Sequence, residues 1–392
     1  MSGQRPGPLV EPGPDLTAEE VRRYARHLLL PEIGREGQRR LKNARVLVVG
    51  AGGLGSPVLL YLAAAGVGTL GVVDDDVVDE SNLQRQVVHA TADVGRAKAD
   101  SARETVSGVN PLVDVVLHRE RLTPGNAAGI VAGYDLVLDG SDNFPTRYLV
   151  NDICTAAGVP CVWGAVLRFG GQVSISWEAH GPQYRDLYPA PPAPEDAPSC
   201  EEAGVLGAIC GAVGSVMAAE AVKLITGAGR PLLGRLLVLD ALAMTWRTLT
   251  VAKDPTRAPA PVPSPVEATG GPACAVPVAE ALPEVGAVEL AGMLRAREAG
   301  GPGFVLVDVR PPHERDIVAI PGAVNVPLAR IASGEALAEL PADADVVLHC
   351  KSGGRSAQAL TALRAAGRTR VRHLRGGVLA WIDEVDPDLP RY

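Results

Sequence analysis

The 392-residue sequence has six cysteines but no CxxC pair, and no histidine stands at metal-ligand spacing from them. This absence excludes a disulfide framework and predicts that the protein holds no structural zinc. There is no basic face either, because lysine and arginine are scattered and the net charge is −8. We therefore expect no nucleic-acid partner. The first fifteen residues lack the apolar core of a secretory signal, so we expect a cytoplasmic protein.

One stretch, residues 203–227, is nearly all small and apolar. It meets Glu220 and Lys223 before it reaches the about 20 uncharged residues that a bilayer requires, so we expect no membrane span. We predict a buried helix instead. Its small residues Gly207, Gly211 and Ser215 would let another helix approach closely, including one from a second subunit.

Strand-like and helix-like segments alternate through the first 250 residues, which is typical of a mainly parallel sheet covered by helices on both faces. The helix after the first strand should have Ser56 as its N-cap, Pro57 in its first turn and Gly66 at its end. We predict an α/β fold with a Rossmann-like domain over residues 1–252. The expected strands are residues 45–50, 69–74, 113–118, 135–140 and 161–166, with a helix around 96–107.

Composition changes at residues 253–282, where proline and alanine dominate and no apolar period survives. We interpret this segment as a semi-extended linker that spans on the order of tens of Å. Strand-like runs at 304–310 and 346–350 then predict a second, smaller α/β domain over residues 283–392.

A glycine-rich turn, Gly50-Ala51-Gly52-Gly53-Leu54-Gly55, joins the first expected strand to its helix. Such glycines let the backbone approach a phosphate, and the helix N-terminus offers unpaired N–H groups. Asp74 ends the next strand, at the position from which a carboxylate can bind a ribose hydroxyl. Taken alone, this pair of features is compatible with NAD.

Two cations and a second carboxylate favour a triphosphate instead. Arg85 and Lys98 add positive charge in an acidic chain, as stabilisation of a leaving pyrophosphate would require. Asp142 ends another strand, at the edge where such sheets bind ligands, and could hold magnesium. Interpretations without a functional role stay open. Arg85 and Lys98 could be solvated surface charges, and Asp142 could cap a helix that starts near Pro145.

These motifs in this order, preceded by RRYARHLLLPEIG, resemble the ubiquitin-activating-type adenylyltransferases of the MoeB and ThiF group over residues 17–250. The resemblance implies that a homodimer uses ATP and magnesium to adenylate the C-terminal Gly-Gly carboxylate of a ubiquitin-like sulfur carrier protein. It implies these contacts: Gly53 at the phosphates, Asp74 at the ribose, Arg85 and Lys98 in catalytic positions on the phosphate chain, Asp142 on magnesium, and Arg26 in the site of the other subunit.

The sequence departs from this family where many members carry two zinc-binding CxxC pairs. Proline stands where the first pair would lie, within residues 184–200, and residues 253–259 lack the second. We therefore expect packing to close this corner without zinc. Cys200 matches the position of a thiol with which some relatives form covalent intermediates, and both a catalytic role and an inert free thiol stay open.

A lone thiol near the C-terminus ends an expected strand and begins a glycine-containing loop before a helix: Cys350, Lys351, Ser352, Gly353, Gly354 and Arg355. Inward-pointing N–H groups and a helix N-terminus favour an anionic sulfur, such as a persulfide. An inert core cysteine would not need the glycines and the arginine, and a phosphatase loop would have five residues between its Cys and Arg, not four. With LVDVRPPHE, IPGAVNVP and LRGGVLAW, residues 283–392 resemble single-domain rhodaneses, although Ala319 replaces a common histidine.

As a whole the chain resembles MoeZ-type adenylyltransferase/sulfurtransferases, which serve carriers of molybdopterin, thiamine, cysteine or secondary-metabolite pathways. The resemblance implies that a Cys350 persulfide, loaded from thiosulfate or by a cysteine desulfurase, converts the adenylated carrier to a thiocarboxylate. Cys200 is a candidate for the thiol that resolves the intermediate. Two other functions stay open: an NAD-dependent oxidoreductase fused to a sulfur-binding module, and a non-enzymatic scaffold that binds carriers.

Overall fold

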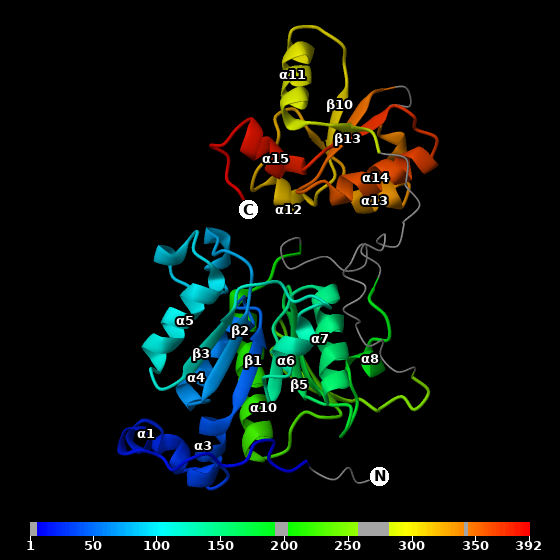
Figure 1. Cartoon of the computed structure of the whole chain (residues 1–392). Helices are drawn as coiled ribbons and strands as arrows, with labels where there is room; N and C mark the ends of the chain where they lie inside the picture. Colours follow the sequence, from blue (N-terminus) through cyan, green and yellow to red (C-terminus); the bar gives the residue numbers. More distant parts are fainter. Residues whose placement is uncertain (1–5, 193–202, 258–281, 341–343) are drawn as a thin grey trace. The chain divides into compact units, whose positions relative to one another are not determined.

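The computed structural model describes residues 6–192, 203–257, 282–340 and 344–392. The chain divides into two compact units, Met1–Gly271 and Pro272–Tyr392 (Figure 1). Most of the expected linker, residues 258–281, lies outside the described residues.

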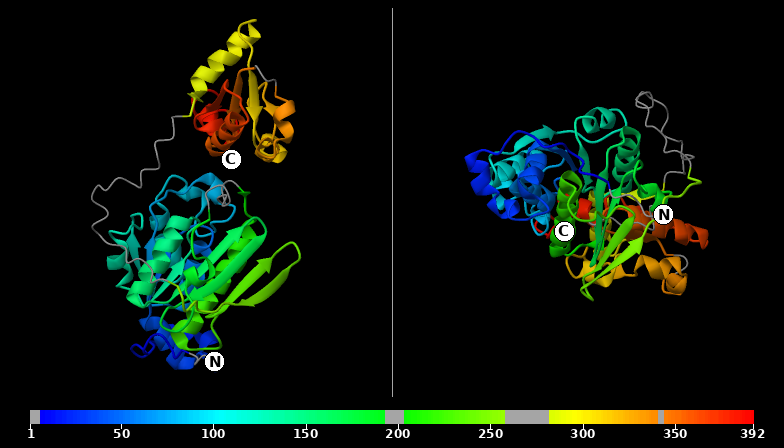
Figure 2. Two further views of the ribbon diagram at one scale, coloured as in Figure 1. Left: turned by 90° about the vertical axis from the view of Figure 1, so that its right-hand side faces the viewer. Right: turned by 90° about the horizontal axis from the view of Figure 1, so that it is seen from below.

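Within the described residues, the first unit is built on one eight-stranded sheet. Its strands are β1 (Arg45–Val49), β2 (Thr69–Val73), β3 (Asp114–His118), β4 (Leu136–Asp139), β5 (Cys161–Leu167), β6 (Gly170–Ser176), β7 (Arg235–Asp240) and β8 (Thr245–Thr250). The spatial order is β3-β2-β1-β4-β5-β6-β7-β8. The first five strands of this order are parallel, and β6, β7 and β8 continue the sheet antiparallel. The prediction of a mainly parallel sheet is confirmed, and β8 lies at a free edge with all its residues exposed (Figure 2).

Helices cover both faces of this sheet (Figure 1). They are α1 (Ala18–Arg23), α2 (Ala25–Leu28), α3 (Gly34–Asn43), α4 (Gly55–Ala65), α5 (Lys98–Val109), α6 (Ala127–Val131), α7 (Phe144–Ala157), α8 (Tyr184–Leu187) and α10 (Gly207–Thr226), with 3-10 turns at Glu80–Asn82 and Thr91–Asp93. Residues of α3, α4, α5 and α10 belong to one hydrophobic cluster, and residues of α6, α7 and α8 belong to another.

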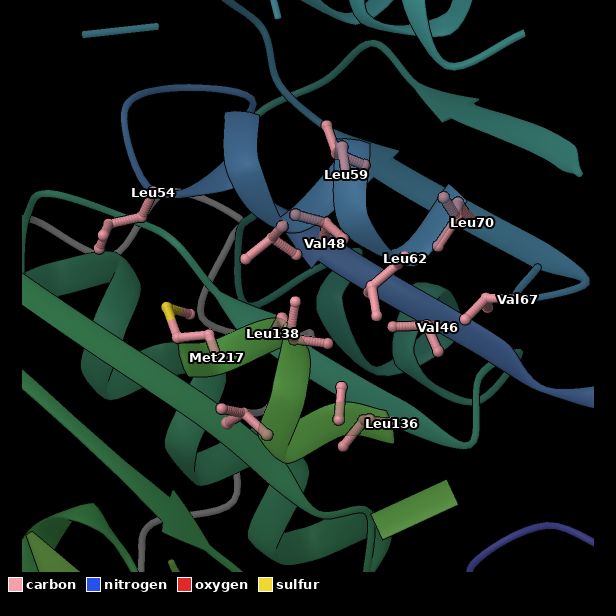
Figure 3. Packing of buried hydrophobic residues seen from close by; sticks show 14 of the residues in the cluster. Val46, Val48, Leu54, Leu59, Leu62, Val67, Leu70, Leu136, Leu138 and Met217 are labelled. Atoms are coloured by element: carbon pink, nitrogen blue, oxygen red, sulfur yellow. The ribbon is translucent and has the colours of Figure 1, made fainter. Parts of the chain in front are cut away.

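The strand β1 shows why two covered faces follow from the sequence. Val46 and Val48 belong to the cluster that contains Leu62 of α4 (Figure 3). Leu47 and Val49 belong to the cluster on the opposite face. Because successive side chains of a strand point to opposite faces, an unbroken apolar run has to be covered on both.

The helix α4 begins slightly earlier than the sequence predicts. Its N-cap is Leu54, so the expectation that Ser56 caps it is wrong. Ser56 lies in the first turn and donates from Oγ to the Gly52 carbonyl at 2.7 Å. The earlier start is possible because Gly55 carries no side chain where the backbone folds tightly. The expected end is confirmed, since Gly66 adopts the left-handed conformation with a φ of +81°.

The small-residue helix α10 approaches the helix α4 closely through Gly214, which is not one of the residues expected to allow such an approach. A Cβ on Gly211 would meet no atom within 4 Å, whereas a Cβ on Gly214 would lie 2.4 Å from Pro57 of α4. Gly214 therefore provides the close approach within this unit, and Gly211 does not. Among the described residues, α10 is the one helix long and apolar enough to cross a membrane by length and composition, and 56% of its most apolar window is buried inside the protein.

The second unit, in its described residues, contains a five-stranded sheet in which every neighbouring pair is parallel. Its strands are β9 (Glu284–Val285), β10 (Val305–Asp308), β11 (Val324–Asn325), β12 (Val346–His349) and β13 (Val371–Leu374), in the order β11-β10-β12-β13-β9. Its helices are α11 (Ala287–Glu298), α12 (Pro312–Arg315), α13 (Leu328–Ala332), α14 (Gly354–Ala365) and α15 (Gly377–Glu384), with a 3-10 turn at Glu335–Ala338. Residues of α11 and α15 belong to one hydrophobic cluster, and residues of α13 and α14 belong to the other.

Candidate functional site

A pocket of about 770 Å³ opens in the first unit where the strand order reverses between β1 and β4. Open α/β sheets bind ligands at such a switch point, beyond the carboxyl ends of the strands. The ends of β1 and β2 and the residues that follow β4 line the pocket, together with the start of α7 and residues of β6 and α8.

The glycine turn after β1 is shaped by contacts that exclude side chains. Gly50 has a φ of +88°, and a Cβ on Gly55 would lie 1.8 Å from the Gly50 carbonyl oxygen. A Cβ on Gly53 would lie 3.0 Å from Sγ of Cys210, the residue of α10 that reaches the pocket. The turn therefore brings bare backbone and the N-terminus of α4 to the pocket, as anion binding requires.

Asp74 follows β2 and lines the pocket. Its carboxylate accepts hydrogen bonds from the N–H groups of Ala51 (2.7 Å) and Asp76 (2.9 Å). Burial raises the pKa of Asp74, while the Ala51 N–H group and the Lys98 ammonium act in the opposite direction. The glycine turn thus holds this carboxylate in place, and its remaining lone pairs can accept from a hydroxyl group.

Lys98 and Arg85 both line the pocket. Lys98 is the first residue of α5 and is only 7% exposed, and its Nζ forms an ion pair with Oδ2 of Asp76 at 2.9 Å. Arg85 is half-buried and donates from Nη1 to the Ser81 carbonyl at 3.0 Å. The interpretation of Lys98 as a solvated surface charge is therefore wrong, because its ammonium is buried beside the pocket.

Asp142 lines the pocket with an exposed side chain. The N-cap of α7 is Asn143, whose Oδ1 accepts from the Thr146 N–H group at 2.9 Å, so the alternative role of Asp142 as that cap is wrong. Magnesium is commonly held by one or two carboxylates together with water and phosphate oxygens. Asp142 fits such a partial ligand set.

Arg147 and Tyr184 line the same pocket but do not follow from the sequence motifs. Arg147 is 7% exposed, its Nη2 donates to the Ser141 carbonyl at 2.7 Å, and its guanidinium lies 5.9 Å from the Tyr184 ring centroid. Its Nε has no hydrogen-bond partner within the described residues. Burial raises the pKa of nearby Asp139, and Arg147 acts against that shift. A charged residue on the buried face of a predicted helix is the signal that could have identified Arg147.

Of the two remaining predicted residues, Arg26 and Cys200, the structure describes only Arg26. Cys200 lies outside the described residues. Arg26 is exposed on α2 and is not part of the lining of its own subunit's pocket. The helix α3 lies at the amino end of β1, away from the carboxyl ends of the strands that line the pocket (Figure 1), and α2 packs against α3. Arg26 would therefore need the pocket of a second subunit to contact a nucleotide.

The sequence predicts that packing closes the corner where many MoeB-like proteins carry zinc, and ion pairs join the described residues of this corner. Arg257 pairs with Asp186 through Nε (2.7 Å) and with Glu178 through Nη2 (2.6 Å), and Lys253 also pairs with Glu178 (2.6 Å). The Asp186 side chain is fully buried. Cations of the chain thus occupy both carboxylates, and these residues do not fit a zinc ion. In the part of the chain that the structure describes, no group of three or more His, Cys, Asp or Glu side chains could hold a metal ion.

In the second unit, the thiol of Cys350 lies buried directly after β12. Its Sγ accepts a hydrogen bond from the Gly353 N–H group at 3.1 Å. Gly353 has a φ of +104° and is the N-cap of α14. The sulfur therefore lies within hydrogen-bond reach of a backbone N–H group and beside the N-terminus of a helix.

Contacts from two other segments fix this loop. The Val378 N–H group donates to the Cys350 carbonyl at 2.8 Å, and a Cβ on Gly377 would lie 2.5 Å from the same oxygen. The guanidinium of Arg355 forms a bidentate ion pair with Glu314 of α12, at 2.5 and 2.8 Å. The carboxylate of Glu314 therefore balances the positive charge of Arg355, which the sequence predicts beside the sulfur.

A buried polar cluster of Asp308, Arg310 and His349 lies next to the Cys350 loop, since His349 directly precedes Cys350. The Asp308–Arg310 ion pair (2.6 Å) is fully buried, and Nε2 of His349 lies 3.9 Å from Asp308. Neither ring nitrogen of His349 has a hydrogen-bond partner within the described residues. Burial lowers the pKa of His349 to about 4, so the imidazole is neutral at neutral pH.

Comparison with known proteins assigns each unit to a family. Residues 24–260 match the ThiF family, and residues 289–384 match the rhodanese-like domain. The chain is 54% identical over 391 residues to the "Probable adenylyltransferase/sulfurtransferase MoeZ" of Mycobacterium tuberculosis, with 98% of each chain covered. It is also 54% identical over 244 residues to the "Sulfur carrier protein adenylyltransferase" of Thermus thermophilus, covering 61% of this chain and 90% of that protein. Among solved structures, that of PaaA matches with a TM-score of 0.53 and 25% identity, over 61% of this chain and 76% of the other.

Proposed function

The chain belongs to the ThiF family and is an adenylyltransferase and sulfurtransferase of the MoeZ type, and on this basis we propose its substrate and its two reaction steps. ATP first adenylates the C-terminal Gly-Gly carboxylate of a ubiquitin-like sulfur carrier protein. A persulfide on Cys350 then converts the acyl-adenylate to a thiocarboxylate. The observation that carries the proposal is the pocket of the first unit, where the glycine turn lies together with the cations Arg85 and Lys98 and the carboxylates Asp74 and Asp142.

The pocket suits a nucleoside triphosphate. We place the phosphates at Gly53 and the N-terminus of α4, with Lys98 and Arg85 on the phosphate chain and Asp74 on the ribose. Asp142 would hold magnesium, which supplies charge neutralisation for the departing pyrophosphate when it is bound.

Adenylation here needs no general base, because a C-terminal carboxylate is already ionised at neutral pH. Its oxygen attacks the α-phosphorus, a new O–P bond forms, and the bond to pyrophosphate breaks. Lys98 and Arg85 stabilise the leaving pyrophosphate. The histidine beside the glycine turn, His89, is not free to act as a base, because both its ring nitrogens already have hydrogen-bond partners. One lies 2.8 Å from Oγ of Ser101 and the other lies 3.0 Å from the Ala51 carbonyl oxygen.

The sulfur step uses the Cys350 persulfide as a nucleophile. Its terminal sulfur attacks the acyl carbon, AMP leaves, and an acyl disulfide joins the carrier to Cys350. A second thiolate then attacks the Cys350 sulfur, releases the carrier thiocarboxylate and leaves a disulfide on the enzyme. Cys200 is our candidate for this thiol, and an external thiol reductant would regenerate both groups. Thiosulfate or a cysteine desulfurase would reload the persulfide.

We further infer that two copies of the chain form a homodimer in which Arg26 of one copy contacts the nucleotide of the other. The exposed position of Arg26, outside the pocket of its own subunit, supports this arrangement. We place the enzyme in the cytoplasm, with no membrane partner. We also expect no nucleic-acid partner, because the net charge is −8 and lysine and arginine are scattered along the sequence.

Exchange of labelled pyrophosphate into ATP tests the proposal. The full chain is incubated with ATP, magnesium and each Gly-Gly-ended carrier, and a carrier lacking its last glycine serves as the matched control. We expect exchange only with the intact carrier. If no intact carrier supports exchange, adenylation is wrong; nicotinamide binding in its place would favour the oxidoreductase alternative. Thiocarboxylate formation by Cys350→Ala would favour the scaffold alternative.

A further inference from the structure

Tyr392 lies close to two cations of the second unit. Its ring centroid is 4.8 Å from Nζ of Lys351, the residue next to Cys350, and 5.7 Å from the guanidinium carbon of Arg310. The ring also packs against the hydrophobic cluster of α11 and α15. Because an aromatic face attracts cations, the ring holds the Lys351 ammonium against the folded unit.

The hydroxyl group of Tyr392 reaches the carboxylate that neutralises the loop arginine. It donates to Oε2 of Glu314 at 3.0 Å and accepts from Nη1 of Arg310. The same Glu314 oxygen accepts from Nη2 of Arg355 at 2.8 Å. Glu314 is thus shared between Arg355 of the loop and Tyr392, which stands 37 residues further along the chain.

Burial raises the pKa of Tyr392 to about 12, so the hydroxyl keeps its proton and remains a donor at neutral pH. Because the Tyr392 hydroxyl also donates to Glu314, the carboxylate shares its negative charge between Tyr392 and Arg355 instead of directing it to Arg355 alone. Arg355 is then less fully neutralised than it would be in an isolated ion pair with Glu314. More positive potential is left at the loop.

We propose that Tyr392 is a positioning residue of the Cys350 loop, which acts through Lys351 and Glu314 to set the affinity of the loop for an anionic sulfur donor. The inference rests on the proposed function of Cys350 as the sulfur-carrying thiol. It assigns the ring and the hydroxyl separate tasks: the ring holds Lys351, and the hydroxyl competes with Arg355 for Glu314.

Transfer of sulfur from thiosulfate to cyanide serves as the probe reaction. The Cys350 thiolate attacks the outer sulfur of thiosulfate, the S–S bond breaks, and sulfite leaves with the electron pair. Cyanide then takes the sulfur from the persulfide and leaves as thiocyanate, which restores the thiolate. Thiosulfate carries two negative charges, so its KM reports the positive potential of the loop.

The variants Tyr392→Phe and Tyr392→Ala in the full chain separate the two tasks. Phe keeps the ring, and we expect the KM for thiosulfate to rise roughly threefold, with kcat within twofold of the parent. Ala removes the ring as well, and we expect the KM to rise about tenfold. Arg391→Ala is the matched control, because Arg391 is exposed, pairs with Asp383 and should change neither constant. Thermal unfolding checks that each variant is folded.

A tail that merely stabilises the fold would lower kcat through loss of active protein and leave the KM unchanged. Unchanged KM in a folded Tyr392→Ala, or an equal effect of Arg391→Ala, would overturn the proposal. Cys350→Ala separates this outcome from failure of the proposed function. If that variant still forms thiocyanate, the role of Cys350 is wrong; if it is inactive while Tyr392→Ala keeps its KM, only the role of Tyr392 is wrong.

Discussion

Replacing Arg257 by methionine tests whether ion pairs hold the corner beside the nucleotide pocket. Methionine removes the charge, so Asp186 stays buried without a cation and, among the described residues, keeps the N–H donors of Gln183 (2.8 Å) and Asp254 (3.1 Å). Breaking a buried ion pair costs about 3–5 kcal/mol. Because two donors remain and Glu178 is 30% exposed, we expect the lower end of this range, about 3 kcal/mol.

Urea unfolding of the full chain measures this loss of unfolding free energy, and because urea is uncharged it does not screen the ion pairs. Tryptophan fluorescence follows both units, since Trp163, Trp177 and Trp246 lie in the first and Trp381 lies in the second. A loss of about 3 kcal/mol should lower the midpoint of the first unit by roughly 1 M, for a slope near 3 kcal/mol/M. The transition of the second unit should not move.

Two comparisons make this prediction refutable. Arg119→Met breaks an exposed pair with Asp100 in the same unit and should leave the midpoint nearly unchanged. Adding EDTA should have no effect, since cations of the chain, rather than a metal, bind the carboxylates at this corner. A midpoint shift for Arg257→Met no larger than that of Arg119→Met would refute the reasoning. Destabilisation by EDTA would also refute it.

The other predictions concern single groups at the two sites. The Cys350→Ala variant should still catalyse exchange of pyrophosphate into ATP but should not replace the terminal oxygen of the carrier by sulfur, which the intact mass of the carrier measures. The Asp142→Ala variant should lose both activities. Asp76→Asn should lower the KM for ATP by up to roughly fivefold, because the 68%-exposed Asp76 side chain competes with phosphates for Lys98; an unchanged KM would contradict this. The pKa of His349 is lowered from 6.5 to about 4 by burial, so between these pH values the unfolded chain binds a proton that the folded chain does not. The second unit should therefore lose up to about 3 kcal/mol as the pH falls from 6.5 to 4, measured by calorimetry, and His349→Gln should flatten that dependence.

Features set by the local chain could be predicted from the sequence. The apolar run of β1 requires cover on both faces, and Gly66 ends α4 because it adopts a positive φ that other residues avoid. The glycine turn could also be predicted, since the space at Gly55 has no room for a side chain. These features depend on near neighbours, so single-sequence reasoning reaches them.

Features set by distant residues could not be predicted in this way. Gly214 rather than Gly211 approaches α4, because the rotation of α10 is decided by the sheet beneath it. Arg147 reaches the pocket from the buried face of α7, and only the fold brings Tyr184 over its guanidinium. Tyr392 meets Glu314 across 78 residues of chain, and no spacing rule connects them.

Each site holds a cation that is already paired with a carboxylate, but the two carboxylates differ in their freedom to leave. The Asp76 side chain is 68% exposed beside Lys98, so it can turn into water when a phosphate arrives, at little cost. The Glu314 side chain is 7% exposed beside Arg355 and is also held by Tyr392, so displacing it would leave a buried charge without partners. The first site can therefore exchange its internal anion for a highly charged ligand. The second has to bind its anionic donor beside an ion pair that stays formed, which is why a residue that redistributes the charge of Glu314 can control the loop.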